Sequence, residues 1–214
     1  MLTPDKMRRF VSLSQGGRWM SEGGEPLGVT FGPDRIAQRP ELAVKISQIA
    51  NAWAVLEANM GACLGVLMRA DPKAAIAMLS KVQTATAKSQ AIREVGKAVL
   101  SDPDLKQLKE LLKKFDAIGK RRNVVVHGMW GTTPEWPEHL VWAPPEVTTN
   151  TILGLLQEHL DGKGEDYLEQ QKELFVVWSA HRFDELFDDI KELITDVVRF
   201  VSHQQMASFM GRVG

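Results

Sequence analysis

Apolar residues recur at alternating spacings of three and four through residues 41–70. They are Ile46, Ile49, Trp53, Leu56, Met60, Cys63 and Leu67. Because an α-helix completes a turn in about 3.6 residues, this spacing places all of them on one helix face. We therefore expect one long amphipathic helix, whose apolar face has to be buried by other parts of the chain.

Four more helices are expected further along the chain. The second helix begins near Asp71-Pro72, and the third runs from about Thr86 to about Leu100. The fourth follows the turn at Ser101-Asp102-Pro103-Asp104, and the last extends from about Phe183 to Met206. Proline in the first helical turn, and serine or aspartate just before it, are typical of helix starts. The fourth and the last helix each carry an apolar stripe. These stripes consist of Leu105, Leu108, Leu112, Phe115 and Ile118, and of Leu186, Ile190, Leu193, Val197 and Phe200.

Two short strands are expected between the fourth helix and the last one. Leu140-Val141-Trp142 and the run from Leu174 to Trp178 are rich in β-branched and aromatic residues, so we expect them to pair as a hairpin. Residues 151–160 suggest a short helix between the two strands, and residues 161–164 a loop.

Tryptophans gather around this predicted hairpin, at positions 130, 136, 142 and 178. Because tryptophans of strands usually pack against neighbouring side chains, we interpret them as a small core that joins the hairpin to the helices. Exposed tryptophans would instead offer a surface for stacking on bases or for binding a partner.

Glycines and prolines crowd the first 40 residues, which predicts an irregular N-terminal arm, although Thr3–Leu13 could form a short helix. The predicted fold class is mainly α, a four- to five-helix bundle with a small β-hairpin inserted before the last helix. In terms of domains, residues 1–40 form the arm, and residues 41–214 form a helical domain whose hairpin insert spans about 128–180.

The charge balance excludes one class of function. Twenty-six lysines and arginines stand against 27 aspartates and glutamates, for a net charge of −1. A protein that wraps nucleic acid without specificity usually carries a basic excess, so this activity is not expected. A local basic site remains open, since five cations cluster within ten residues. They are Lys113, Lys114, Lys120, Arg121 and Arg122.

The single cysteine, Cys63, rules out a disulfide within the chain and a zinc site built from cysteines. Its position in an apolar helical run indicates a packed core thiol. The N-terminus lacks the apolar stretch of a signal peptide and no run reaches transmembrane length, so we expect no membrane association and a cytoplasmic location.

The end of the fourth helix holds the most distinctive residues. Continuing its apolar stripe leads to Gly119, Arg122 and Val126, which places Arg122 on the buried face, where a guanidinium needs a partner or a functional cleft. Asn123 and His127 are four residues apart and share a helix face. We expect Arg122, Asn123 and His127 to converge there. The alternative is that the helix dipole alone favours cationic side chains at this end.

Glu57 is the only charged residue between Lys45 and Arg69 and lies beside the apolar face of the first long helix. A carboxylate in such a place usually needs a cation, and Arg122 or His127 is the expected partner. The alternative is that Glu57 reaches solvent at the edge of the stripe.

The sequence resembles the HEPN superfamily in two respects. Arg122 is followed directly by Asn123 and, after four intervening residues in all, by His127, and a long helical pattern surrounds Glu57. The motif of this superfamily is an arginine, four to six residues and a histidine, often with a polar residue after the arginine. The resemblance covers about residues 41–205 in architecture but only six or seven residues in motif. Arg121, with five residues before His127, would also match the motif.

The resemblance implies a homodimeric, metal-independent and cofactor-free endoribonuclease with a composite site. In this reading Arg122 holds the phosphate, His127 transfers a proton and Asn123 orients His127 or binds a phosphate oxygen. Glu57 and Arg121 support the site, and Lys120 and Lys114 bind RNA.

Relatives of this kind include toxins with a protein antitoxin and antiphage effectors. HEPN domains also occur as non-catalytic dimerisation or scaffold modules. A third reading is a module that binds RNA without turnover.

Overall fold

The computed structural model describes residues 30–32, 34–134, 136–145 and 176–210, together with the backbone of three short strands at 10–11, 18–20 and 26–28. The chain divides into two compact units. We call Met1–Ser47 with Asn123–Asp184 the sheet unit, and Gln48–Arg122 with Glu185–Gly214 the helical unit. Helices α1, α4 and α7 each contribute residues to both units.

Helices dominate the described residues, as the sequence predicts. They are α1 (Pro40–Met68), α2 (Pro72–Ser80), α3 (Ala85–Val99), α4 (Asp102–His127) and α7 (Ala180–Met210), with a short 3-10 helix η2 (Ile36–Gln38) before α1. The α2 start confirms the expected signal, because the Asp71 carboxylate accepts hydrogen bonds from the N–H groups of Lys73 and Ala74. Such caps satisfy donors that have no partner within the helix.

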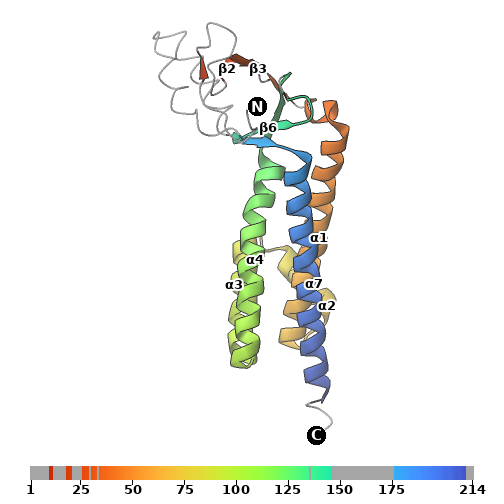
Figure 1. Cartoon of the computed structure of the whole chain (residues 1–214). Coiled ribbons are helices and arrows are strands. Elements are labelled where there is room, and N and C mark those ends of the chain that lie inside the picture. Colours follow the sequence, from red (N-terminus) through yellow and green to blue (C-terminus); the bar gives the residue numbers. More distant parts are fainter. Residues whose placement is uncertain are drawn as a thin grey trace, which may run out of the picture. The chain divides into compact units, whose positions relative to one another are not determined.

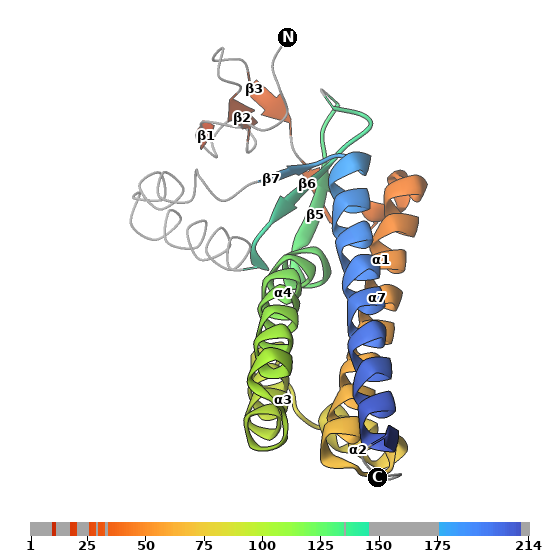
Figure 2. The ribbon, with the colours of Figure 1, turned by 60° about the horizontal axis from the view of Figure 1, so that its bottom comes forward.

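In the helical unit, α3 lies alongside α4, and α1 lies alongside α7 (Figures 1 and 2). The predicted apolar stripes of α1, α4 and α7 supply its core. The buried side chains include Ile49, Trp53, Leu56, Met60, Leu108, Leu112, Phe115, Leu186, Ile190, Leu193, Val197 and Phe200. Helix α2 approaches α1 closely at Gly61, where a Cβ atom would lie 2.9 Å from Cα of Ile76. A larger residue at this position would push the two helices apart.

The sheet unit contains a four-stranded antiparallel sheet in the order β4-β5-β6-β7. Its strands are Thr30–Phe31, Met129–Thr132, Leu140–Ala143 and Val176–Trp178, and the last three lie side by side in Figure 2. The predicted pairing of the last two strands is confirmed, with Val141 opposite Val177.

The sheet is nevertheless larger than the predicted hairpin. Strand β5 follows α4 after one residue and is too short to reveal an alternating pattern. Strand β4 pairs with β5 across about a hundred residues of sequence, with Thr30 opposite Thr132. Pairing between segments so distant in the chain leaves no local signal, so the sequence pattern could not show it.

Within the segment expected to form an irregular arm, the described residues include three short strands that form an antiparallel sheet in the order β1-β2-β3. The strands are Phe10–Val11, Arg18–Met20 and Pro26–Gly28. Strand β1 replaces the end of the short helix expected through Leu13. The helix expected at 151–160 and the loop at 161–164 lie outside the described residues.

Tryptophans form a small core in the sheet unit, as expected. The Trp130 ring centroid lies 5.9 Å from that of Trp178 and 5.6 Å from that of Phe183, and Trp178 and Phe183 are 4.9 Å apart. Trp130 and Trp178 are buried, whereas Trp136 and Trp142 are half-buried. The interpretation as a packed core therefore holds for the centre of the cluster.

Helix α1 departs from the expectation that no run reaches transmembrane length. Among the described residues it alone has the length and composition of a membrane-crossing helix, with a mean hydropathy of 1.2 in its most apolar window. Half of that window is buried within the protein. A core helix of a globular protein meets the same criterion, and the buried side chains of α1 match that description.

Cys63 is buried in α1, and burial raises the pKa of its thiol to about 12. We expect the native thiol to react with iodoacetamide at pH 8 at least about a thousandfold more slowly than the unfolded chain, because only the thiolate reacts.

The folded state also holds the proton of the Cys63 thiol more tightly than the unfolded chain does. The thiol therefore contributes stability that is intact below pH 9 and is lost from there towards pH 12, by about 1.4 kcal/mol per pH unit. Alkylation rates and alkaline urea titrations, with Cys63→Ala as control, test both effects. Fast native alkylation would contradict the first.

Candidate functional site

Arg122 is half-buried in the helical unit, as the stripe of α4 predicts. Its guanidinium carbon lies 5.9 Å from the ring centroid of Trp53. Trp53 is itself buried and stacks on Phe115, with the ring centroids 4.9 Å apart. A guanidinium over an aromatic face gains electrostatic attraction and loses part of its freedom. Trp53 therefore holds Arg122 against the core.

Asn123 and His127 are exposed at the end of α4, in the part of this helix that belongs to the sheet unit. Their separation of four residues places them about 40° apart around the helix axis, so they share a face. The apolar stripe continues differently from the expectation, because Val125 is buried and Val126 is exposed. The helix thus keeps an apolar side through its last turn while it presents Asn123 and His127 to solvent.

Two tryptophan indoles cap the end of α4. The last four carbonyl groups of a helix lack partners within it. The Trp142 Nε1–H donates to the Val124 carbonyl at 2.7 Å, and the Trp130 Nε1–H donates to the Val125 carbonyl at 3.2 Å. Gly128 lies under the Trp142 ring, where a Cβ atom would stand 1.4 Å from Nε1. The helix end that carries Asn123 and His127 is therefore bound to strands β5 and β6.

Glu57 has a cationic partner that the sequence did not suggest. Its Oε1 forms an ion pair with Nζ of Lys88 on α3 at 2.5 Å. Lys88 is buried, and the Glu57 side chain is 31% exposed. The prediction that this carboxylate needs a cation is confirmed, but the cation comes from a helix whose contact with α1 no sequence spacing reveals.

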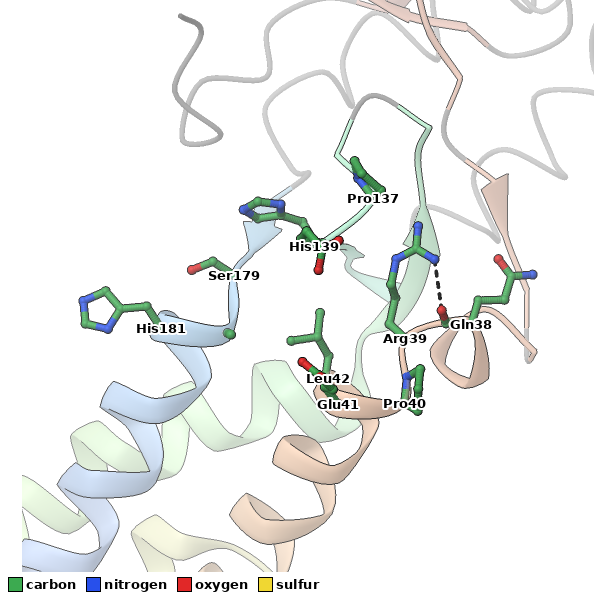
Figure 3. Close-up of a pocket in the computed structure, with 11 residues that line it drawn as sticks. Gln38, Arg39, Pro40, Glu41, Leu42, Pro137, His139, Ser179 and His181 are labelled. Atoms are coloured by element: carbon green, nitrogen blue, oxygen red, sulfur yellow. Dashed lines mark hydrogen bonds between the residues drawn. The ribbon is translucent and has the colours of Figure 1, made fainter.

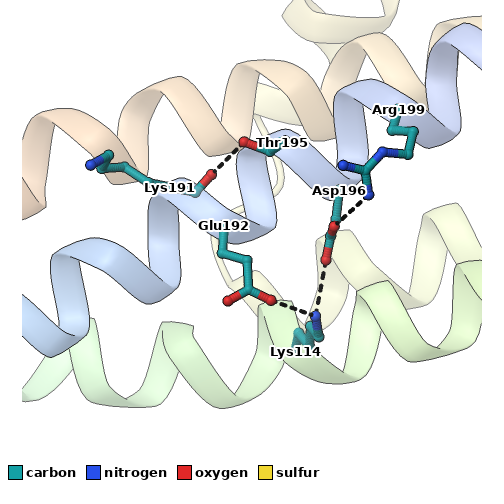
Figure 4. A network of polar contacts seen from close by, with 6 residues as sticks. All are labelled: Lys114, Lys191, Glu192, Thr195, Asp196 and Arg199. Atoms are coloured by element: carbon teal, nitrogen blue, oxygen red, sulfur yellow. Dashed lines mark hydrogen bonds and ion pairs between the residues drawn. The ribbon is translucent and has the colours of Figure 1, made fainter.

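Carboxylates of α7 engage part of the basic cluster of α4. Lys114 contacts Asp196 at 2.9 Å and Glu192 at 3.3 Å, as Figure 4 shows, and Arg121 forms an ion pair with Asp189. The hydrogen bond to Asp196, followed by that to Glu192, raises the pKa of Lys114 above its usual value. Lys120 is exposed. The two lysines expected to bind RNA thus differ in their surroundings. Lys114 is held by an intramolecular network of ion pairs, whereas Lys120 faces solvent.

A cavity of about 610 Å³ lies in the sheet unit, away from any residue singled out by the sequence as a site. Figure 3 shows that its walls come from the start of α1, the loop before β6, and the start of α7. The lining side chains include Arg39, His139, Ser179 and His181. Because about a hundred and forty residues separate Arg39 from His181 in the chain, no spacing rule could group them.

Among the described residues, no three histidine, cysteine, aspartate or glutamate side chains cluster as metal ligands would. The acidic residues at the start of α7 instead form ion pairs, such as that between Asp184 and Lys45 at 2.5 Å. Comparison of the chain with protein family models, with curated proteins and with solved structures yields no significant match.

Proposed function

We propose that this protein is a HEPN-like endoribonuclease that cleaves RNA without a metal ion, at a composite site formed by two copies of the chain. The observation that carries the proposal is the exposure of Asn123 and His127 on one face of α4, at an end that is capped by two indoles. A firmly bound helix end keeps an acid–base group in one orientation, which proton transfer requires.

The chemistry needs only protein side chains. The 2′-oxygen of a ribose attacks the adjacent phosphorus as the bond from phosphorus to the 5′-oxygen breaks. A histidine takes the 2′-proton or protonates the leaving 5′-oxygen, because an imidazole exchanges protons near neutral pH. In this scheme His127 performs the transfer, Arg122 stabilises the charge on the phosphate, and Asn123 binds a phosphate oxygen. The products are a 2′,3′-cyclic phosphate and a 5′-hydroxyl.

The geometry of one helix favours a dimer. His127 lies five positions after Arg122, so their side chains leave α4 about 140° apart around its axis. One copy therefore directs the guanidinium and the imidazole to different sides. Two copies related by a two-fold axis can bring the arginine of one to the histidine of the other.

The supporting residues take revised roles in this proposal. Glu57 stabilises the helical unit through Lys88, and Arg121 joins α4 to Asp189. Lys120 is exposed beside the motif, and in this proposal its charge contacts the RNA backbone. A cytoplasmic toxin with an antitoxin, or an antiphage effector, is the cellular role that goes with this activity.

A non-catalytic homodimeric scaffold is the second candidate. The observation in its favour is that acidic residues of α7 engage Lys114 and Arg121 within the chain. These contacts reduce the positive charge offered to a phosphate backbone, and phosphate contacts supply most of the affinity of proteins for nucleic acid.

Incubation of the purified protein with single-stranded RNA in EDTA tests the proposal. We expect cleavage that leaves a 2′,3′-cyclic phosphate and spares the matching DNA, which lacks the 2′-hydroxyl. His127→Ala should lower the rate by at least about a hundredfold. His203→Ala is the matched control, since His203 is exposed on α7, and its activity should equal that of the wild type.

Arg122→Lys adds a second test, because it keeps the positive charge but loses the planar fork that binds phosphate with two hydrogen bonds. We expect it to reduce cleavage while Arg199→Lys, at an exposed position of α7, does not. RNA that stays intact at high concentrations of a folded, dimeric wild-type protein would contradict the nuclease and favour the scaffold.

A further inference from the structure

Four lysines form a row on the outer surface of α4, within the helical unit. They are Lys106, Lys109, Lys113 and Lys120, and all four are exposed. Because successive residues of an α-helix are turned by about 100°, their side chains leave α4 within an arc of about 60°. At a rise of about 1.5 Å per residue, this lysine row extends for about 21 Å along the helix.

The cations of α4 divide into two groups by their surroundings. On the side that meets α7, Lys114 and Arg121 form ion pairs with carboxylates of that helix, and Figure 4 shows those of Lys114. No lysine of the row forms an ion pair with any residue in the part of the chain that the structure describes. The charges of the row are therefore free to bind a ligand.

Helix stability does not account for the lysine row. The helix dipole favours cations near the C-terminal end, whereas Lys106 lies near the start of α4. Lys109 and Lys113 are four residues apart, a spacing at which like charges repel one another and weaken a helix slightly. The helix itself therefore gains little from this arrangement of charges.

Arg93 of α3 adds a fifth cation beside the row. Helices α3 and α4 lie side by side and are joined by a two-residue turn, so they run in opposite directions (Figures 1 and 2). Ser89 Oγ donates to Oδ2 of Asp116 at 3.0 Å, which fixes their register. Arg93 follows Ser89 by about one turn, and Lys113 precedes Asp116 by about one turn. Arg93, which is half-buried, therefore lies at the level of Lys113.

Carboxylates near the row reduce its charge without cancelling it. They are Asp102, Glu110 and Asp116, together with Glu94, which is paired with Lys97. The first three stand against five cations, the row and Arg93, so this surface keeps two positive charges on a chain whose net charge is −1. Positive charge is thus concentrated on one surface of the helical unit, which attracts a negatively charged partner.

We propose that the lysine row and Arg93 bind the phosphate backbone of single-stranded RNA. The phosphates of one strand follow one another along a line, so a row of cations fits a single strand and contacts it whatever its sequence. The choice of RNA rests on the nuclease proposed above, whose substrate the row would hold. Lys120 precedes His127 by seven residues, about two turns of the same helix, so the row and the proposed acid–base group follow one line along α4.

Fluorescence anisotropy of the full chain with a labelled 2′-O-methyl oligouridine of about 15 nucleotides tests this binding. Its 2′-oxygen carries no proton, so the proposed reaction cannot cleave it and binding is measured separately from cleavage. Each contact with a phosphate of a single strand contributes about −0.7 to the slope of log affinity against log salt. Five contacts predict a slope of about −3.5, or binding about a hundredfold tighter at about 50 mM than at about 200 mM KCl.

A pair of substitutions in the row, Lys109→Gln with Lys113→Gln, removes two of these contacts. We expect the slope to become shallower by about 1.4 and the affinity at low salt to fall about tenfold or more. The matched control is Lys73→Gln with Lys81→Gln, because both lysines are exposed, lie at the two ends of α2, and change the net charge by the same amount. This control should bind like the wild type.

Three outcomes would overturn the proposal. One is no binding of the 2′-O-methyl RNA at about 50 mM KCl and about 100 µM protein. Another is equal weakening by the two pairs of substitutions, because overall charge and not the row would then attract the RNA. The third is a slope that the substitutions in the row leave unchanged. Cleavage of unmodified RNA without this binding would contradict the row alone, whereas salt-dependent binding with unmodified RNA left intact would contradict the nuclease alone.

Discussion

Replacing Trp53 by alanine should lower the free energy of unfolding by about 3–5 kcal/mol, the usual cost of removing a large aromatic side chain from a core. Trp53 is 3% exposed and stacks on Phe115, and a Cβ atom at Gly119 would lie 3.1 Å from its ring. The surroundings of a core side chain relax only partly into the space that its removal leaves. The substitution also removes the aromatic face beneath the guanidinium of Arg122.

Urea unfolding followed by far-ultraviolet circular dichroism measures this loss. Trp53→Phe is the matched variant, because it keeps an aromatic ring against Phe115 and beneath Arg122. It should retain more than half of the lost stability. A loss below about 1 kcal/mol for Trp53→Ala would mean that Trp53 is not part of the core, since buried aromatic truncations cost far more.

Replacing Gly128 by alanine should cost about 3 kcal/mol or more, at the upper end of the range for overpacking a well-filled site. The new Cβ atom would stand 1.4 Å from Nε1 of Trp142, so the indole has to move. Its movement breaks the 2.7 Å hydrogen bond to the Val124 carbonyl and loosens the end of α4. In the proposed nuclease, cleavage should fall with the stability, because His127 lies in the turn that this hydrogen bond holds.

A double-mutant cycle isolates the cause. In a Trp142→Leu background the indole is absent, so Gly128→Ala should cost much less than in the wild type, with a coupling energy of about 1–3 kcal/mol. Thermal or urea unfolding of the four proteins measures it. If Gly128→Ala costs the same in both backgrounds, the contact with Trp142 is not the reason why glycine stands at this position.

Local patterns predicted the helices and their buried faces well. The stripes of α1, α4 and α7 are buried where the three-four spacing indicated, and the cap at Asp71 begins α2. The pairing of β6 with β7 was also predicted, because β-branched and aromatic runs mark both strands. The helices, their buried faces and the strand character of β6 and β7 depend on residues close to one another in the chain, so a single segment contains the signal.

The candidate site shows the limit of the same reasoning. Helix geometry placed Arg122 on the buried stripe and Asn123 and His127 on a shared face, and Arg122 is half-buried while the other two are exposed. The expected convergence of all three does not follow from the same geometry, because Arg122 and His127 leave α4 about 140° apart. The partner of Glu57 does not follow from it. A lone carboxylate beside an apolar face indicates that some cation must approach, whereas Lys88 is that cation only because α3 packs beside α1.

The sequence alone was therefore sufficient for helices α1, α2, α3, α4 and α7, for the buried stripes of α1, α4 and α7, and for the exposed Asn123 and His127 at the end of α4. Tertiary structure decided the partners: Lys88 for Glu57, Trp53 for Arg122, and the indoles of Trp130 and Trp142 for the carbonyls that end α4. It also brought Arg39, His139 and the start of α7 to one cavity. Periodicity reports that a face is covered, but the covering residues come from distant segments, and only packing chooses among them.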